Sequence, residues 1–448
     1  MQCGLIIPDP PQCNRGFLRT GTVILCLLAV SGLQVVGQPV QVPEQLTFSE
    51  ALEIAETNNP TFRAVTSLLE LARADRREAG APPNPFLEVE GEEYAGFANN
   101  PPSFWDGQAL IVRLEQELEV GGQRGHRRRV ADAAITVARY QVADARRTLL
   151  ATVGHAYLGL ALAQADQSLA RDALRNIEQI IQVTEVRYNL GEVAGTDLRR
   201  LQIERLHFVE ELFRTDLAIG DARIALLQVL GAADPGQMVA AIDSLDTPPM
   251  VDPTGRLIAS TQGVAVELDS LHAIALERRP DFLGVRHERA RAAAAVRLQR
   301  ARTIPNLTVG WGYRRSFGDH AMDFAIGVPL PLFGLNPGGV QRAEAELRRV
   351  ESMEAAAQSI VRSDVERANR AVIISAERVS SIEEKYEGDV TELLGLVRAS
   401  WEIGESSLLT LLDAEREYLA TRKVRNEILH ALRSSMVDLA TAMGIPPR

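Results

Sequence analysis

The sequence predicts a mostly α-helical chain that contributes a few strands to a membrane β-barrel. Three observations lead to this fold class: an export signal, an internal repeat with long helical stretches, and short segments in which apolar residues alternate. Charged residues make up 24% of the 448 residues, and the mean hydropathy is −0.05. This composition argues against a bundle of transmembrane helices, because such a bundle needs several apolar runs of about 18 residues.

Residues 1–37 have the pattern of a secretory signal peptide. Arg15 and Arg19 precede a short apolar run at 23–30, and small or polar residues follow it. A basic region, a short apolar region and a small-residue exit are typical of a cleaved leader, and the run is too short for a membrane anchor. We expect export and cleavage near Gly37.

All three cysteines, Cys3, Cys13 and Cys26, lie inside this predicted leader. The exported chain would then have no disulfide and would gain its stability from a large core or from oligomerisation. Cys26 is a candidate lipidation site, although Leu25 precedes it where a small residue is expected. The net charge of −11 argues against binding to nucleic acid.

Landmarks of one unit occur twice, in the same order. "ALEIAETNNP" at 51–60 matches "LHAIALERRP" at 271–280, and the same alignment pairs Asn84 with Asn306, Gly122 with Gly334 and Gly191 with Gly404. Gly122 and Gly191 are 69 residues apart, and Gly334 and Gly404 are 70 apart. The alternative is a chance likeness between helices rich in Ala and Arg. The sequence predicts a first repeat at 38–230, a linker or equatorial segment at 231–266 and a second repeat at 267–448.

Each repeat contains two strand-like segments, at 86–92 and 110–120 and at 307–313 and 324–332. In 110–120, Leu110, Val112 and Leu114 alternate with Ile111, Arg113 and Glu115. Alternation over about ten residues predicts half-buried strands that are long enough to cross a bilayer. Four strands cannot close a barrel, so we expect three chains to supply twelve strands.

If the apolar residues face lipid, the acidic residues between them face the lumen. Three chains would then line the barrel with carboxylates that could guide cations. The alternative is that this face is acidic only because barrel interiors are generally polar. The residues are Glu88, Glu90, Glu92, Glu115, Glu117 and Glu119.

Beyond Gly122 and Gly334 the apolar period changes to three and four residues, which indicates long coiled-coil helices. A helix of about 69 residues extends about 100 Å and must pack beside partners of similar length. The predicted stripe of the second repeat comprises Val361, Val365, Ala368, Val372, Ala376, Val379, Ile382, Tyr386, Val390, Leu393 and Val397.

"YNLGEVAGTDL" at 188–198 and "WEIGESSLLTLLDAE" at 401–415 resemble the hairpin tips of TolC-type outer-membrane factors. "LEQELEVGGQRGHRR" at 114–128 resembles the CzcC-like heavy-metal subgroup, with Gln123 where a basic residue is expected. The resemblance implies a homotrimer in outer-membrane lipid, with its barrel continued by a helical tunnel in the periplasm.

By the same resemblance the chain would be a passive exit duct for heavy-metal cations. Its partners would be a periplasmic adaptor (membrane fusion) protein and an inner-membrane pump of the resistance-nodulation-division type. Two alternatives stay open: a periplasmic coiled-coil adaptor or scaffold, and an outer-membrane factor for drug efflux or type I protein secretion.

The resemblance also assigns residues at the tips. Thr196, Asp197, Thr410 and Asp413 would line the periplasmic aperture, and Tyr188, Gly191, Trp401 and Gly404 would form the hairpin tips that dock the adaptor. Thr410 and Ser406 stand where the family has an aspartate and an arginine, so a tightly closed, doubly acidic gate is not predicted. Repeated around a threefold axis, Asp197 and Asp413 would form cation-selecting rings; the alternative is that both are solvated residues near helix starts.

Gly191 and Gly404 predict positive φ at the two helix ends.

The sequence contains no pattern that predicts catalysis, a metal site or a cofactor. The seven histidines, at 126, 155, 207, 272, 287, 320 and 430, include no i,i+4 pair, and the predicted exported chain has no cysteine. Phosphate-binding loops, nucleophile elbows and H-E-x-x-H motifs are also missing from the sequence. We therefore expect a protein that is not an enzyme.

Overall fold

The computed structural model describes residues 42–92, 109–246, 268–316, 319–332, 334–385 and 387–447. The predicted signal peptide at 1–37, with Cys26, lies outside the described residues, as does Tyr386 of the predicted stripe. The described residues all belong to one compact unit.

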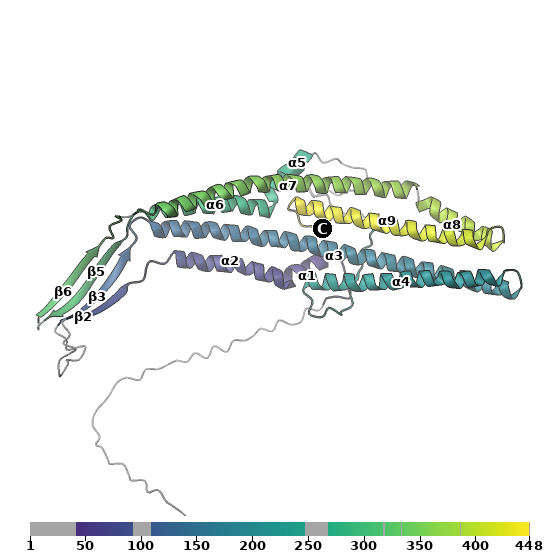
Figure 1. The fold of residues 1–448 in the computed structure, drawn as a ribbon, viewed down its shortest axis with the longest axis horizontal. Coiled ribbons are helices and arrows are strands. Elements are labelled where there is room, and N and C mark those ends of the chain that lie inside the picture. The colour runs from purple at the N-terminus through teal and green to yellow at the C-terminus, as the bar shows by residue number, and fades with distance from the viewer. Residues whose placement is uncertain are drawn as a thin grey trace, which may run out of the picture. The chain divides into compact units, whose positions relative to one another are not determined.

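Helices and strands follow one another in two similar series (Figure 1). In Figure 1 the four long strands lie at one end of the helices, and the α3–α4 and α8–α9 turns lie at the other. The first series is α1 (Phe48–Asn58), α2 (Pro60–Ala79), β2 (Phe86–Glu92), β3 (Ala109–Leu118), α3 (Gln123–Asn189) and α4 (Gly195–Leu230). The second is α5 (Leu268–Arg278), α6 (Pro280–Ala301), β5 (Leu307–Ser316), β6 (Asp319–Gly327), α7 (Pro337–Lys385), α8 (Glu387–Glu402) and α9 (Leu408–Ala442).

The four strands form one antiparallel sheet in the order β2-β3-β5-β6. The two repeats meet inside this sheet, since β3 belongs to the first and β5 to the second. Strand β6 spans 319–327, so the predicted strand at 324–332 is wrong at both ends. Pro329 and Pro331 lack the N–H that a strand ladder needs, and pairing stops before them.

The sheet has one apolar face and one polar face, as its register shows. Residues paired across antiparallel strands share a face, which confirms the predicted alternation. On the apolar face, Phe324 and Ile326 of β6 are 76% and 77% exposed. The apolar face comprises Leu87, Val89, Leu110, Val112, Leu114, Leu118, Leu307, Val309, Trp311, Tyr313, Met322, Phe324 and Ile326.

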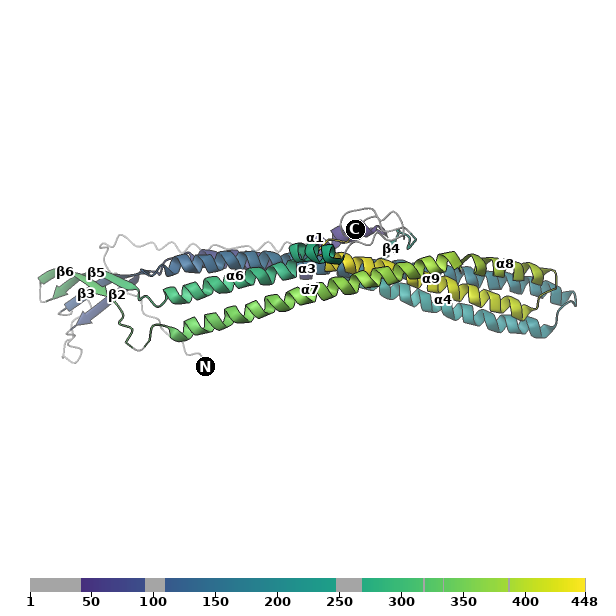
Figure 2. The same ribbon diagram turned by 90° about the horizontal axis from the view of Figure 1, so that it is seen from above.

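The long helices pack side by side. Helix α3 contacts α2, α4, α6 and α9, while α7 contacts α6 and then α9, as Figure 2 also shows. Among the described residues only α3 is long and apolar enough, by length and composition, to cross a membrane. Half of its most apolar window is buried against the rest of the chain, as is usual for the core helix of a bundle.

The described parts of the predicted long helix of the second repeat are α7 and α8, which lie on either side of position 386. Val361 and Val365 of the predicted stripe are buried in α7. In α8, however, Leu393 is 47% exposed and the neighbouring Leu394 is buried. The predicted stripe is therefore off by one position at Leu393, because Leu394, Val397 and Trp401 form the face of α8 that packs against the core.

In both series, the end of the last helix packs against the break between the first two helices. Asn59, whose carboxamide caps α2, also donates from Nδ2 to Val229 O at 2.8 Å, near the end of α4. Gly231 follows α4 with a φ of 74°, and a Cβ there would lie 2.8 Å from Asn58 O. Gly444, after α9, has a φ of 72° and lies equally close to the α5–α6 break. Each half thus docks its last helix on the break between its first two.

A small parallel pair, β1 (Gln45–Leu46) with β4 (Ala240–Ala241), lies against the middle of α3. Tyr157 of α3 is buried beneath it, and its hydroxyl donates to Leu46 O and to Asp243 Oδ2, each at 2.8 Å. Of the segment predicted as a linker or equatorial part, 231–246 is described and 247–266 lies outside the description.

Candidate functional sites: hairpin tips and polar strand face

The two hairpin turns at the tips have one design. Gly191 and Gly404 have φ angles of 78° and 84°, which confirms the positive φ predicted for both. Glu192 N–H donates to Arg187 O and Glu405 N–H donates to Ser400 O, both at 2.9 Å. These bonds, five residues back along the chain, are those of the Schellman motif that ends a helix before a reversal.

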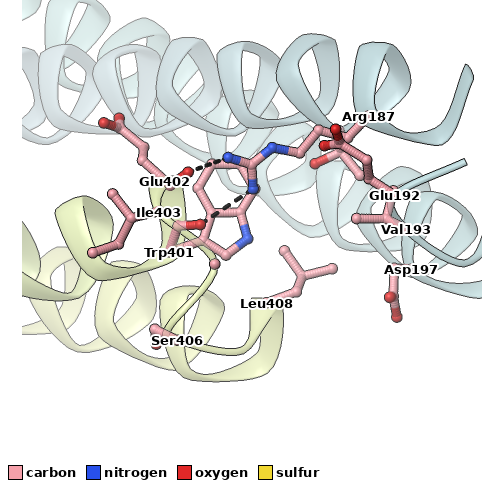
Figure 3. A pocket seen from close by; sticks show the side chains of 11 residues that line it. Arg187, Glu192, Val193, Asp197, Trp401, Glu402, Ile403, Ser406 and Leu408 are labelled. Carbon is pink, nitrogen blue, oxygen red and sulfur yellow. Dashed lines mark hydrogen bonds between the residues drawn. The ribbon is translucent and has the colours of Figure 1, made fainter. Parts of the chain in front are cut away.

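Arg187 joins one turn to the other. Its Nη1 donates to Trp401 O at 3.2 Å, and its Nη2 donates to Glu402 O. The guanidinium also lies over the Trp401 ring, 5.0 Å from the centroid (Figure 3). Such a cation–π contact adds roughly 0.5–2 kcal/mol to the hydrogen bonds. Arg187 has no signal of this role in the sequence, because its partner Trp401 lies more than two hundred positions away.

Between the turns lies an open cleft of about 380 Å³ (Figure 3). Asp197 and Ser406, two positions singled out from the sequence, both line it, together with Glu192, Trp401 and Leu408. The cleft therefore brings the first-repeat aspartate close to the second-repeat turn. Most of its surface is polar.

The other predicted aperture residues lie apart from this cleft. Thr196 is exposed, and Thr410 is part of the α9 cap, where its N–H donates to Ser407 Oγ at 3.2 Å. Asp413 is exposed and lies 3.5 Å from Arg416. Asp197 therefore lines the cleft, and Asp413 is not among its lining residues.

The predicted docking residues differ in exposure. Tyr188 is exposed, and its ring lies against Gly195, where a Cβ would be 3.2 Å from Cε2. Trp401 is only 7% exposed and packs with Leu411 and Leu412. The indole therefore belongs to the core beneath the turn, and adaptor docking at Trp401 stays a prediction. Leu190 and Ile403, which directly precede the two tip glycines, are 70% and 71% exposed.

The predicted acidic residues of the strands share the polar face of the sheet. Glu88 and Glu90 pair with Arg113 and Ile111, and Glu115 pairs with Phe86. Glu117 lies on the same face and accepts from Asn306 Nδ2 at 2.6 Å. Glu92 has the same register position, but its side chain lies outside the described residues.

Glu119 does not belong to this face. Strand β3 ends at Leu118, and Glu119 forms two hydrogen bonds with Arg127 at the start of α3. Its side chain is 9% exposed. Glu119 thus follows the strand and pairs with the start of α3, and its place in the lumen stays a prediction.

The profile of the outer membrane efflux protein family matches residues 51–232 and 271–445. The chain belongs to this family. CzcC, the cobalt-zinc-cadmium resistance protein of Cupriavidus metallidurans, is 23% identical over 386 residues, which are 86% of each chain. CusC, a cation efflux system protein of Escherichia coli K12, is 25% identical over 312 residues, 66% of this chain and 64% of CusC.

Solved structures of channels have the same fold as this outer membrane efflux protein. A CusC crystal structure superposes with a TM-score of 0.72 at 20% identity, over 89% of this chain and 92% of CusC. The Campylobacter jejuni CmeC outer membrane channel also gives 0.72, at 15% identity, over 89% of this chain and 85% of CmeC. The TolC-type, mostly helical fold is confirmed.

Membership of the family confirms the resemblance drawn from the tips and the location in the outer membrane. Outer membrane efflux proteins are transport ducts, not enzymes, and they work with a periplasmic adaptor and an inner-membrane pump. The alternative of an adaptor or scaffold that never enters the membrane is thereby overturned.

Ion pairs hold this outer membrane efflux protein together where its helices meet. Buried Arg279, before α6, pairs with Asp281 at 2.7 Å and with Asp364 of α7 at 3.0 Å. Burial by itself raises the pKa of Asp281, but the hydrogen bond and charge of Arg279 outweigh it and hold that pKa below its ordinary value. In the part of the chain that the structure describes, no group of three or more His, Cys, Asp and Glu side chains could hold a metal ion.

Proposed function

We propose that three copies of this outer membrane efflux protein close a twelve-stranded barrel whose helices continue as a periplasmic tunnel. The supporting observation is the four-stranded sheet, which has an exposed apolar face and, among the described residues, two edge strands paired on one side only. In lipid, unpaired edge groups cost several kcal/mol each, so β2 of one chain must pair with β6 of the next.

A second exposed apolar stripe supports the proposal that neighbouring copies also contact each other along the tunnel. It lies on α4, where exposed apolar residues recur at coiled-coil spacing. Exposed apolar residues on this scale generally mark an interface. The stripe comprises Ile203, Leu206, Phe213, Leu217 and Ile224, which are 51–72% exposed.

The tips are the proposed docking surface for the adaptor. Leu190 and Ile403 would be repeated three times around the axis, next to the glycine turns at Gly191 and Gly404. Asp197 and Asp413 would form two separate carboxylate rings at the aperture, with Thr196 and Thr410 beside them. Since position 410 is a threonine and carries no carboxylate, Asp413 alone would supply the charge of the second ring.

The proposed cargo is heavy-metal cations, delivered by a pump of the resistance-nodulation-division type. The polar strand face supports this proposal, because its acidic side chains favour cations over anions. CzcC is named for cobalt, zinc and cadmium resistance, and CusC is named for cation efflux. The rival is an organic cargo, since OpmQ of Pseudomonas aeruginosa, 24% identical over 416 residues, is named for pyoverdine export.

Gene deletion in the native host tests the cargo. Growth would be measured against zinc, cobalt, cadmium and copper salts and against common antibiotics, with the intact gene returned as the control. Sensitivity to one or more metals, reversed by the gene, supports the proposal. Sensitivity to antibiotics alone would overturn the metal cargo and favour drug efflux, and a secreted protein lost from the medium would favour type I secretion.

A further inference from the structure

The side chain of Arg113, on β3, forms hydrogen bonds with the neighbouring strand β2 and with β6, which lies beyond β5. Its Nη1 donates to Glu88 Oε2 of β2 at 3.0 Å, and its Nη2 donates to Asp323 Oδ2 of β6 at 2.7 Å. Glu115 lies 4.0 Å from the same guanidinium. Three carboxylates of the polar face thus converge on one positive charge.

Two glycines of β5 make this reach possible. Strand β5 lies between β3 and β6, so the Arg113 side chain must lie across it to meet Asp323. A Cβ at Gly310 would be 3.2 Å from Arg113 Cδ, and one at Gly312 would be 3.1 Å from Arg113 Cα. Both glycines are buried, and any side chain there would crowd the arginine.

The guanidinium of Arg113 is held against the polar face of the sheet. Its side chain is 21% exposed, and hydrogen bonds from two of its nitrogens hold the guanidinium. Arg314, the other arginine of this face, is exposed. The carboxylates of the face with described side chains are Glu88, Glu90, Glu115, Glu117, Asp319 and Asp323.

We propose that Arg113 determines the ion selectivity of the duct by neutralising part of this acidic wall. The inference rests on the proposed function, in which the polar face lines the lumen. Fixed charges act on passing ions over about 10 Å at 0.1 M salt. One charge per chain therefore acts on an ion that passes one or two strands away. With Arg113 in place, Glu88, Glu115 and Asp323 attract cations less strongly than three free carboxylates would.

The test is the reversal potential of purified full-length trimers in planar bilayers under a potassium chloride gradient. Arg113→Gln is expected to raise the ratio of potassium to chloride permeability by about threefold, since each chain loses one positive charge from the wall. Arg113→Lys should stay near the wild type, and adding Asp323→Asn to Arg113→Gln should reverse the shift. Arg315→Gln is the matched control, because it removes an equal charge from the opposite face of the same sheet.

The outcomes separate the inference from the proposed function. An unchanged permeability ratio in conducting Arg113→Gln trimers, or an equal shift in Arg315→Gln, would overturn the inference and leave the duct intact. If Arg113→Gln does not assemble, Asp323→Asn alone should lower the preference for cations, and an unchanged ratio there would also overturn it. Wild-type protein that forms no trimer or conducts no ions would overturn the proposed function itself.

Discussion

Arginine side chains make many of the contacts between distant parts of this chain. Arg187 joins the two tips, Arg279 joins α6 to α7, and Arg113 connects three strands. Lysine occurs only at 385 and 423. The planar guanidinium explains this use, because it donates in several directions and also stacks on aromatic rings. At the residue scale, the fold therefore depends on arginines whose partners cannot be identified from neighbouring sequence.

From the contacts of Arg187 we expect that replacing this residue loosens the tip. Arg187→Ala loses two hydrogen bonds and the cation–π contact, so local stability should fall by roughly 1–3 kcal/mol. Faster limited proteolysis at the tips and a shifted fluorescence of Trp401 would report the change. The exposed Arg199→Ala is the control. Equal protection in both variants would show that Arg187 does not hold the turns together.

The two tip aspartates predict a change in conductance. Asp197→Ala combined with Asp413→Ala removes both proposed carboxylate rings, so single-channel conductance should rise and the preference for cations should weaken. Planar bilayers measure both quantities. The exposed Asp221→Ala, further along α4 from the tip, is a control for the loss of a carboxylate. If conductance and preference are unchanged, neither aspartate belongs to the aperture.

Asp281 predicts a loss of stability in acid. Because its pKa is held below the ordinary value, its ionised form stabilises the fold above about pH 4, and this stabilisation is lost as the pH falls through the lowered pKa. The Tm of Asp281→Asn should lie below that of the wild type at about pH 7, and the gap should narrow towards about pH 3. Thermal unfolding in detergent measures it, with Asp221→Asn as the control. A gap that stays constant with pH would contradict the prediction.

At the element scale, helix breaks and helix ends determine how the two halves close. Pro60 and Pro280 begin α2 and α6, and each break receives the end of the last helix of its half. The prolines and the tip glycines are readable in the sequence, because each restricts or permits a backbone angle. The docking of Gly231 and Gly444 on these breaks is not readable, since it depends on where two remote helices finish.

Gly231 predicts a large effect from a small substitution. Gly231→Val puts a β-branched side chain at a φ of 74° and within contact of Asn58 O, so unfolding should become easier by at least about 2 kcal/mol. The matched control is Gly220→Ala within α4, where a Cβ meets nothing within 4 Å. That change should stabilise α4 by roughly 0.5–1 kcal/mol. Similar Tm values for the two variants would rule out the close approach.

At the scale of the whole molecule, the exposed apolar surface indicates an assembly. Phe324 and Ile326 on the sheet and Phe213 and Leu217 on α4 are all more than half exposed. A soluble monomer rarely leaves such stripes uncovered. Lipid and neighbouring copies account for them together, since the sheet needs both an apolar medium and partners for its edges.

The apolar sheet face predicts sensitivity to charge. Phe324→Arg and Val112→Arg place a charge in the proposed lipid region at about 2–4 kcal/mol per site, so the yield of trimers should fall. Ala321→Arg, on the polar face of β6, is the matched control and should assemble. Semi-native gels of outer-membrane extracts measure the trimer. Normal yield for all three variants would show that this face does not contact lipid.

The sequence by itself determined the repeat, the alternating strands, the tip glycines and the family, because each depends on local periodicity or on residues with special backbone angles. Tertiary structure alone decided where β3 ends, that Glu119 pairs with Arg127, that α8 buries Leu394 and not Leu393, and which partners Arg113, Arg187 and Arg279 have. The physical reason is distance along the chain. Contacts between residues that are hundreds of positions apart form only when long helices and strands are already aligned, and no short pattern specifies that alignment.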